Sequence, residues 1–309
     1  MDTFVIAFKT VLPLFLIIII GMVFSRVKVN HTNWIEVLNK YALWIGFPAL
    51  VIFSLMKLNL EQNSYSSFIL LNSAFIIGSM ILVFPICRIF GLSIHLKRTL
   101  FLILPFGNVS YLGIPILYNA FGANILPEAA IISAVYVFWL LTLAIIMIEI
   151  FGEEKINIKK LGRSLVRNPL LLSVFVGLAI VLLKIRLPDY AEKTIELFAD
   201  SVTAVVLFSL GIFLGMQSIG KLKDWLQVLA LTLLTMLFLP FIFYQIVLLL
   251  NIETTSLKAI IIDAAMPLGV TPYVLAVQYK LKTTLVARVI VLGTLLSMVI
   301  IPLWMVWLG

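Results

Sequence analysis

Long apolar segments dominate this chain and limit what it can fold into. A helix needs about 20 apolar residues to cross the roughly 30 Å hydrocarbon core of a bilayer. The chain is 63% hydrophobic and 12% charged, with a mean hydropathy of +1.18, whereas soluble domains carry about 25% charged residues. We therefore predict an all-α integral membrane protein with ten transmembrane helices, over residues 4–25, 33–56, 66–90, 96–121, 126–151, 166–184, 193–217, 225–250, 256–279 and 284–308.

The fourth of these segments is interrupted at its centre. Residues 105–115, PFGNVSYLGIP, place prolines and glycines around Asn108 and Ser110. Proline removes a backbone donor and clashes with the preceding turn. Non-helical backbone is tolerated at membrane depth only where it contacts protein or a water-lined cavity. The ninth segment has a second interruption, at residues 266–273. Two interrupted segments at corresponding places in two halves indicate the binding site of a transporter.

A polar and basic segment, residues 152–168, divides the chain into halves of five predicted helices each, residues 1–151 and 169–309. Because five is odd, the second half enters the membrane from the opposite side, which makes the halves an inverted repeat. The interrupted helices are the fourth of each half. We therefore predict two inverted five-helix repeats joined by a basic linker.

The basic residues predict the orientation in the membrane. Most of the 22 Lys and Arg residues follow odd-numbered segments, among them Arg26, Arg88, Lys155 and Lys221. Cytoplasmic loops carry the excess of Lys and Arg in membrane proteins. We therefore expect a multi-pass plasma-membrane protein with both termini extracellular. The net charge of +8 then reflects topology, and the expected partners are the lipid bilayer and small molecules, with no nucleic acid.

Several motifs together resemble the auxin efflux carrier family, which contains plant auxin transporters and bacterial malate and malonate permeases. Phe106-Gly-Asn-Val-Ser-Tyr-Leu-Gly-Ile-Pro115 is similar to the family's fourth-span motif. Each motif is weak alone, and their order along the chain makes them specific. The others are Phe47-Pro-Ala-Leu50, Arg167-Asn-Pro-Leu170, Leu207-Phe-Ser-Leu-Gly211, Ala265-Met-Pro267 and Gly293-Thr-Leu-Leu-Ser297.

This resemblance implies a particular fold and mechanism. The broken helices 4 and 9 would cross near the membrane midplane, as in sodium/proton antiporters and bile-acid symporters. Helices 1, 2, 6 and 7 would form a scaffold subdomain, and helices 3–5 and 8–10 a transport subdomain that moves against it in an elevator-type motion. The bacterial relatives imply malate, malonate or similar organic anions as substrates.

The interruptions provide the candidate substrate-binding residues. A broken helix has a new N-terminus inside the membrane, and its free N–H groups and dipole favour a carboxylate. We expect one such half-helix to begin near Gly113. Asn108 is the leading candidate because its amide both donates and accepts; alternatively, it satisfies carbonyls that the prolines leave free. The expected substrate-binding residues are Gly107, Asn108, Ser110, Thr271, Tyr273, Ser54 and Tyr136, and the expected helix breaks are Pro105, Gly113, Pro115, Pro267 and Pro272.

Two aspartates inside predicted helices are candidates for ion coupling. A charged residue within a span costs about 2.5–3.5 kcal/mol on insertion scales, so such residues are functional candidates. Asp263 lies about one turn before the second interruption, where it would take up a proton or a cation; alternatively, it pairs with a lysine. Asp200 lies in the outer part of the seventh segment, with Lys9 as a candidate partner.

We therefore expect a secondary active transporter, or permease, of small organic anions such as dicarboxylates or auxin-like carboxylates. The sequence contains no GxxxxGK[ST] loop for ATP, so a gradient would drive transport, preferably of protons. A sodium-coupled symporter or a cation/proton antiporter is the alternative. An intramembrane enzyme or a sensor is a weaker alternative, because the chain has two His and no HExxH motif. No enzymatic activity, cofactor or metal is expected, and a homodimer stays open.

Overall fold

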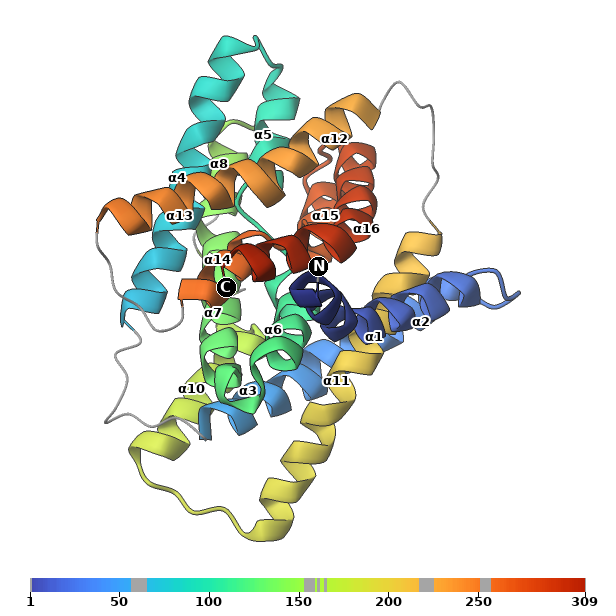
Figure 1. Ribbon diagram of the computed structural model, residues 1–309, viewed down its shortest axis with the longest axis vertical. Coiled ribbons are helices and arrows are strands. Elements are labelled where there is room, and N and C mark those ends of the chain that lie inside the picture. The colour runs from blue at the N-terminus through green and yellow to red at the C-terminus, as the bar shows by residue number, and fades with distance from the viewer. Residues whose placement is uncertain are drawn as a thin grey trace.

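The computed structural model shows a bundle of helices (Figure 1). It describes residues 2–56, 66–152, 159, 162–163, 166–216, 225–250 and 257–308. Most of the basic linker predicted at 152–168 therefore lies outside the described residues. Within the described ranges the chain forms helices and no strand, so the all-helical class is confirmed.

The helices overlap the segments that the sequence marks as apolar, and several begin a few residues earlier than predicted. The first half contains α1 (Asp2–Phe24), α2 (His31–Tyr41), α3 (Phe47–Met56), α4 (Ser66–Ile89), α5 (Ile94–Ile103), α6 (Ile114–Phe121), α7 (Leu126–Trp139) and α8 (Ile145–Ile150). The second half contains α10 (Pro169–Leu182), α11 (Asp189–Gly215), α12 (Trp225–Leu233), α13 (Leu239–Leu249), α14 (Leu257–Ala264), α15 (Val270–Gln278) and α16 (Thr283–Trp307).

Six continuous helices are long and apolar enough to cross a membrane: His31–Phe53, Ser66–Ile89, Ala123–Ile150, Asp189–Gly215, Trp225–Leu249 and Thr283–Trp307. Shorter apolar helices cover Leu12–Phe24, Val109–Phe121 and Leu171–Leu182. The fourth and ninth predicted segments are not among the six because each is divided into two shorter helices. The arrangement as ten spans in an inverted repeat stays a prediction.

Proline positions explain most of the wide helical turns. The structure describes four π-helical segments, Ala42–Gly46, Val109–Gly113, Leu140–Ala144 and Leu234–Phe238. All but Leu140–Ala144 are followed at once by a helix with a proline at its second residue: Pro48, Pro115 and Pro240. Proline cannot donate to the carbonyl four residues earlier, and its ring clashes with that carbonyl. A locally widened turn accommodates the clash without ending the helix.

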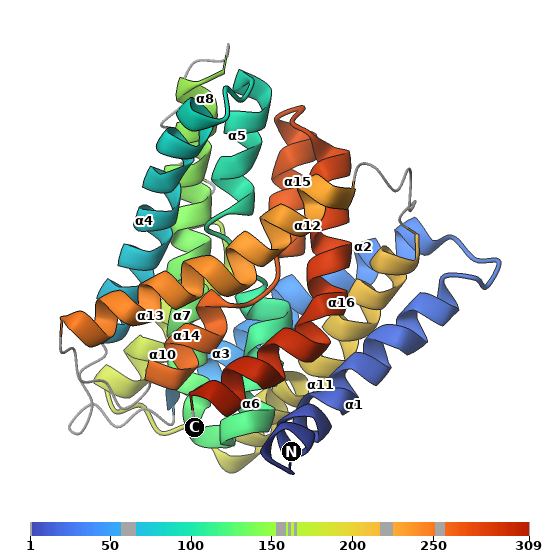
Figure 2. The same ribbon diagram turned by 45° about the horizontal axis from the view of Figure 1, so that its top comes forward.

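The helices pack into two groups (Figures 1 and 2). The α11 group consists of α1, α2, α3, α10 and α11, in which α1 lies along α11 and α3 lies between α10 and α11. The α14 group consists of α4, α5, α8 and α12–α16. Helix α7 contacts members of both groups, α6 packs against α1 and α7, and the terminal helices α1 and α16 pack together.

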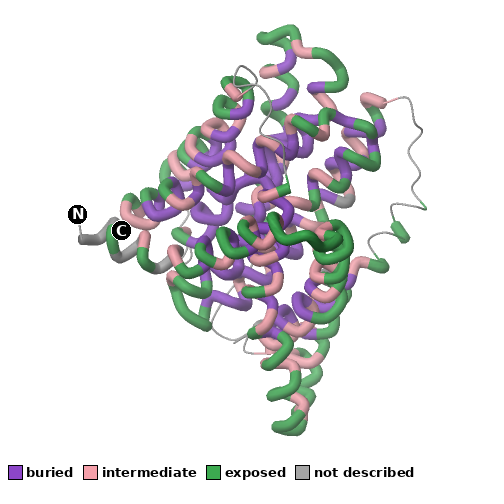
Figure 3. The backbone as a smooth tube through the Cα atoms, turned by 90° about the vertical axis from the view of Figure 1, so that its right-hand side faces the viewer, coloured by how far each residue is buried: buried purple, intermediate pink, exposed green. Residues whose placement is uncertain are grey.

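Burial is concentrated where the helices cross (Figure 3). Many large hydrophobic side chains are exposed on the outer faces. Large hydrophobic side chains such as Leu70, Phe175 and Leu249 are mostly exposed, Leu249 to 80%. Soluble proteins rarely expose contiguous apolar surface of this kind. These faces therefore suit contact with lipid.

Candidate functional site

The two interruptions of the helices meet at the centre of the molecule. The backbone N–H of Asn108 donates to the carbonyl of Pro267 at 2.6 Å, and that of Gly269 donates to the carbonyl of Phe106 at 3.3 Å. This short antiparallel bridge pairs Gly107 with Leu268. A Cβ at Gly107 would lie 3.0 Å from Cβ of Met266, so the close approach of the two segments favours glycine there. Two segments about 160 residues apart in sequence thus satisfy each other's backbone, as membrane depth requires.

The first interruption is shorter than the sequence predicts. Pro105 lies within it, but the helix resumes at Val109, with Asn108 at the N-cap position. The expectation that the half-helix begins near Gly113 is therefore wrong. The carbonyl of Asn108 already accepts from the N–H groups of Leu112 at 3.1 Å and Gly113 at 2.9 Å, so the first turn closes before Gly113.

The predicted break residues fall into two sets. Pro105 and Pro267 lie in the non-helical stretches. Gly113 ends the π-helical segment, and Pro115 and Pro272 lie within the first turns of α6 and α15. Pro272 costs no hydrogen bond, because the first N–H groups of a helix have no partner within it. Pro115 lies farther along the continuous helix Val109–Phe121, where the widened segment before it accommodates the ring.

Asn108 presents a buried and unused hydrogen-bond donor. Its side chain is 3% exposed, and Nδ2 has no hydrogen-bond partner among the described residues. The amide therefore does not satisfy carbonyls freed by the prolines. The continuous helix Val109–Phe121 begins at this residue, and its first N–H groups carry the positive end of the helix dipole. Together they can bind a carboxylate.

Two adjoining hollows lie at this point. The smaller, about 30 Å³, is lined by residues of both interruptions, among them Asn108, Ser110, Tyr136, Gly269 and Thr271. The larger, about 390 Å³, shares Ser110, Tyr111, Val137, Leu140 and Thr271 with it and continues to Glu36, Asn39, Lys40, Leu43, Phe47, Asn168, Val270 and Val274. We call the larger hollow the cavity. It lies between the α11 group on one side and the two interrupted segments on the other.

The structure brings most of the predicted substrate-binding residues together. Gly107, Asn108, Ser110, Tyr136 and Thr271 all line the smaller hollow, the cavity or both. The hydroxyl of Tyr136 is buried and has no partner among the described residues, whereas the hydroxyl of Ser110 is hydrogen-bonded to that of Ser133.

Two predicted substrate-binding residues are not placed there. The ring of Tyr273 packs against Phe213 of α11, with ring centroids 5.3 Å apart, and Tyr273 does not appear in the lining of either hollow. The side chain of Ser54 lies outside the described residues.

Asp263 lies beside the crossing, in the last turn of α14. It is 1% exposed, and its Oδ1 has no hydrogen-bond partner in the described part of the chain. A Cβ on Gly113 would lie 2.6 Å from this Oδ1, so the carboxyl group packs directly against the first turns after Asn108. A carboxylate is disfavoured at a helix C-terminus, where the dipole is negative.

Asp200 is not part of this site. It is exposed on α11, as is Lys9 on α1. Phe213, which contacts Tyr273, follows Asp200 by 13 residues on the same helix, a distance of about 20 Å at 1.5 Å per residue. The structure therefore separates the two aspartates that the sequence grouped as ion-coupling candidates.

Sequence reasoning missed the polar wall of the cavity on α2. Glu36, Asn39 and Lys40 line it, although the sequence suggests only helix-end residues there. Asn39 and Lys40 follow Glu36 by three and four residues, which places all three on one helix face. This spacing is the feature of the sequence that could have identified the wall.

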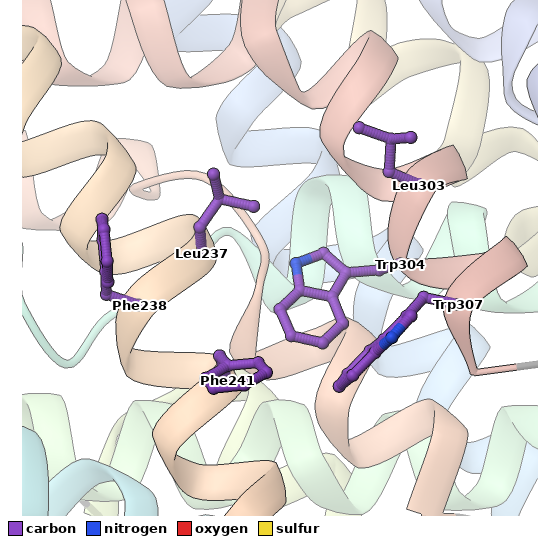
Figure 4. A pocket seen from close by; sticks show the side chains of 6 residues that line it. All are labelled: Leu237, Phe238, Phe241, Leu303, Trp304 and Trp307. Carbon is purple, nitrogen blue, oxygen red and sulfur yellow. The ribbon is translucent and has the colours of Figure 1, made fainter.

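A separate groove is formed by Leu237, Phe238 and Phe241 on one side and Leu303, Trp304 and Trp307 of α16 on the other (Figure 4). Its volume is about 270 Å³ and its lining is apolar. It offers no charged group to an anion, so it is not a candidate substrate site.

Comparisons with known proteins identify the family of this chain. Residues 6–305 match the family model described as membrane transport protein. Over 159 residues, 50% of this chain, the sequence is 28% identical to auxin efflux carrier component 8 of Arabidopsis thaliana, and the match covers 43% of that protein. The sequence is also 29% identical to auxin efflux carrier component 3a of Oryza sativa subsp. japonica over 157 residues, and this match covers 48% of this chain and 24% of that protein. The chain thus spans less than half the length of these plant relatives.

A full-length relative also matches. The chain is 22% identical over 309 residues to an uncharacterised transporter of Methanocaldococcus jannaschii. This match covers 97% of this chain and 98% of the relative. The family match extends over nearly every predicted helix, including both interruptions. The chain therefore belongs to the membrane transport protein family of the auxin efflux carriers.

Proposed function

We propose that this protein is a secondary active transporter of small organic anions, and that the carboxylate of the substrate binds at Asn108. One observation carries this proposal: Asn108 Nδ2 is a buried donor without a partner among the described residues, at a helix N-terminus in the lining of the smaller hollow, which adjoins the cavity. A buried donor left unpaired costs about 1–3 kcal/mol. A bound carboxylate would remove that cost and accept from the free N–H groups of the same turn.

The position of the cavity supports an elevator-type mechanism. Residues of α2 and α3 form one wall, and residues of the two interrupted segments form the other. In this proposal the α11 group is the scaffold. The third to fifth and the eighth to tenth of the ten predicted membrane segments move against it. The two interruptions would move together, because two backbone hydrogen bonds join them. The protein would lie in the plasma membrane with both termini extracellular and the end of the cavity at Lys40 cytoplasmic.

A proton bound at Asp263 is our proposal for coupling. Asp263 is buried, its Oδ1 is unpartnered among the described residues, and it lies at the negative end of a helix. Each of these features disfavours a bare carboxylate. A sodium ion is the alternative, but it requires several oxygen ligands around the carboxylate. An antiporter with paired acids finds no support, because Asp200 is exposed whereas Asp263 is buried.

Uptake into proteoliposomes tests the proposed function. Labelled malate, malonate and indole acetate would be supplied with an imposed pH or sodium gradient. We expect Asn108→Ala to lower uptake by about 10- to 100-fold, because a hydrogen bond to a charged group contributes about 1.5–3 kcal/mol. Asn119→Ala is the matched control, since Asn119 is exposed on the same helix. Uptake that is unchanged in Asn108→Ala would overturn the binding site.

Asp263→Asn tests the coupling in the same vesicles. Asparagine has the shape of a protonated aspartate but cannot release a proton. We expect uptake to lose its response to the pH gradient while exchange of labelled for unlabelled substrate continues. Uptake by Asp263→Asn that still follows the pH gradient would contradict the role of this residue.

A further inference from the structure

The cavity wall on α2 carries an ion pair. Among the described residues that line the cavity, Glu36 and Lys40 are the charged ones. Lys40 Nζ lies 2.6 Å from Glu36 Oε1, one helical turn apart. Their side chains are 67% and 57% exposed, so solvent and solutes can reach both.

We propose that Lys40 captures the anionic substrate by exchanging its partner. In the empty cavity Lys40 is paired with Glu36, and when an organic anion enters, the ammonium group binds the anion's carboxylate instead. This inference rests on the proposed function and adds a residue that selects charged substrates before they reach Asn108.

The exchange is energetically easy because the existing pair is weak. An exposed pair at this spacing contributes only about 0.3–0.5 kcal/mol, so little is lost when it opens. The rest of the wall nearby is apolar, with Leu43, Phe47 and Val274. A charge next to such a wall is less screened than one in open water, which strengthens the attraction between Lys40 and an anion inside the cavity.

The helix that carries Lys40 is held in place on both sides of it. The hydroxyl of Ser209 in α11 donates to Asn39 Oδ1 at 2.9 Å, and the hydroxyls of Tyr41 and Ser201 are 2.6 Å apart. The backbone at Lys40 is therefore fixed to α11, while its long side chain stays free to turn. A lysine on an anchored helix can follow a substrate without any movement of the wall.

Glu36 has a definite role in this arrangement. When it is paired, its charge cancels that of Lys40, so the empty cavity neither repels anions nor holds small inorganic anions tightly. Removal of Glu36 would leave Lys40 fully available. The two residues therefore have opposite effects on the affinity for an anion, and the effect of Glu36 depends on Lys40.

The test is the concentration dependence of uptake into proteoliposomes, with whichever of malate, malonate and indole acetate the unmodified protein transports. We expect Lys40→Gln to raise KM about five- to tenfold and Glu36→Gln to lower it severalfold, each with little change in kcat. The double variant should behave like Lys40→Gln. Raising the salt concentration should reduce both effects, and Lys40→Arg should retain most of the affinity.

Lys193→Gln is the matched control. Lys193 forms a similar pair with Glu196, 2.7 Å apart on α11, and neither residue lines the cavity. Changes of KM in the same direction for Lys40→Gln and Glu36→Gln, or changes no larger than that of Lys193→Gln, would overturn the inference while leaving the proposed function intact. An unmodified protein that transports none of the three carboxylates would overturn the proposed function, and this inference with it.

Discussion

Gly113 shows how a single residue connects the two halves of the site. Its φ of −62° is ordinary for a helix, so the residue is not required for its backbone freedom. It is required for space, because a Cβ would lie 2.6 Å from Asp263 Oδ1. The carboxyl group of α14 and the first turns of the helix that follows Asn108 are therefore in direct contact.

Gly113→Ala should destabilise the protein by about 1–3 kcal/mol, as overpacking does in tightly packed cores. The measurement is the thermal unfolding temperature of the purified protein in detergent. Gly78→Ala is the control, because a Cβ there would meet nothing within 4 Å. The double variant Gly113→Ala/Asp263→Ala should recover part of the loss. Equal unfolding temperatures for Gly113→Ala and Gly78→Ala would contradict this packing.

At the scale of elements, a proline in one helix is compensated by a tryptophan in another. Pro240 cannot donate to the carbonyl of Met236, four residues earlier. The indole Nε1 of Trp304 in α16 donates to that carbonyl at 2.9 Å, and its nitrogen points toward the helix that carries Leu237 (Figure 4). The widened segment Leu234–Phe238 is thus joined to α16 through a carbonyl that the proline leaves free.

Trp304→Phe should cost about 1–2 kcal/mol of stability, because the buried carbonyl loses its donor. The cost should shrink in a Pro240→Ala background, where the N–H of the alanine can bond to the same carbonyl. Unfolding free energies of the four variants in this cycle measure the coupling. Trp307→Phe, in the same groove, is the control. A cost for Trp304→Phe that is the same in both backgrounds would show that the hydrogen bond does not compensate for the proline.

At the scale of the whole molecule, aromatic contacts join the helix groups that would slide past each other in an elevator. Phe213 of α11 meets Tyr273 of α15, with ring centroids 5.3 Å apart. Inside the α14 group, Phe241 meets Trp307 at 5.7 Å. A relative movement of the two groups must break the first contact and leave the second in place.

Cross-linking tests this movement. In a chain without its single cysteine (Cys87→Ala), the pair Phe213→Cys/Tyr273→Cys should stop transport when a short thiol cross-linker is added. The pair Phe241→Cys/Trp307→Cys should stay active under the same treatment. The measurement is uptake alongside the fraction of cross-linked protein on a gel. Full uptake by a largely cross-linked first pair would rule out an elevator movement at this contact.

The sequence predicts the helical class and much of the candidate site, because both depend on local chemistry. Apolar segments identify the helices, and Asn108 and Asp263 are conspicuous because polar residues are costly within such segments. The start of the helix at Val109 was not predictable locally, since it depends on hydrogen bonds to residues far along the chain. The same holds for Tyr273, which turns toward α11, and for Lys40, which faces a cavity that exists only after the helices pack.

The bridge between the interruptions has a consequence for how such a protein can diversify. Both of its hydrogen bonds join main-chain atoms, from Asn108 to Pro267 and from Gly269 to Phe106. Every amino acid except proline offers the same N–H, and all offer the same carbonyl. Most substitutions of the side chains of Asn108, Ser110 or Thr271 therefore leave these two backbone hydrogen bonds in place. A different substrate can be accommodated by substitution of these side chains alone, while the backbone bridge between the two interruptions stays the same.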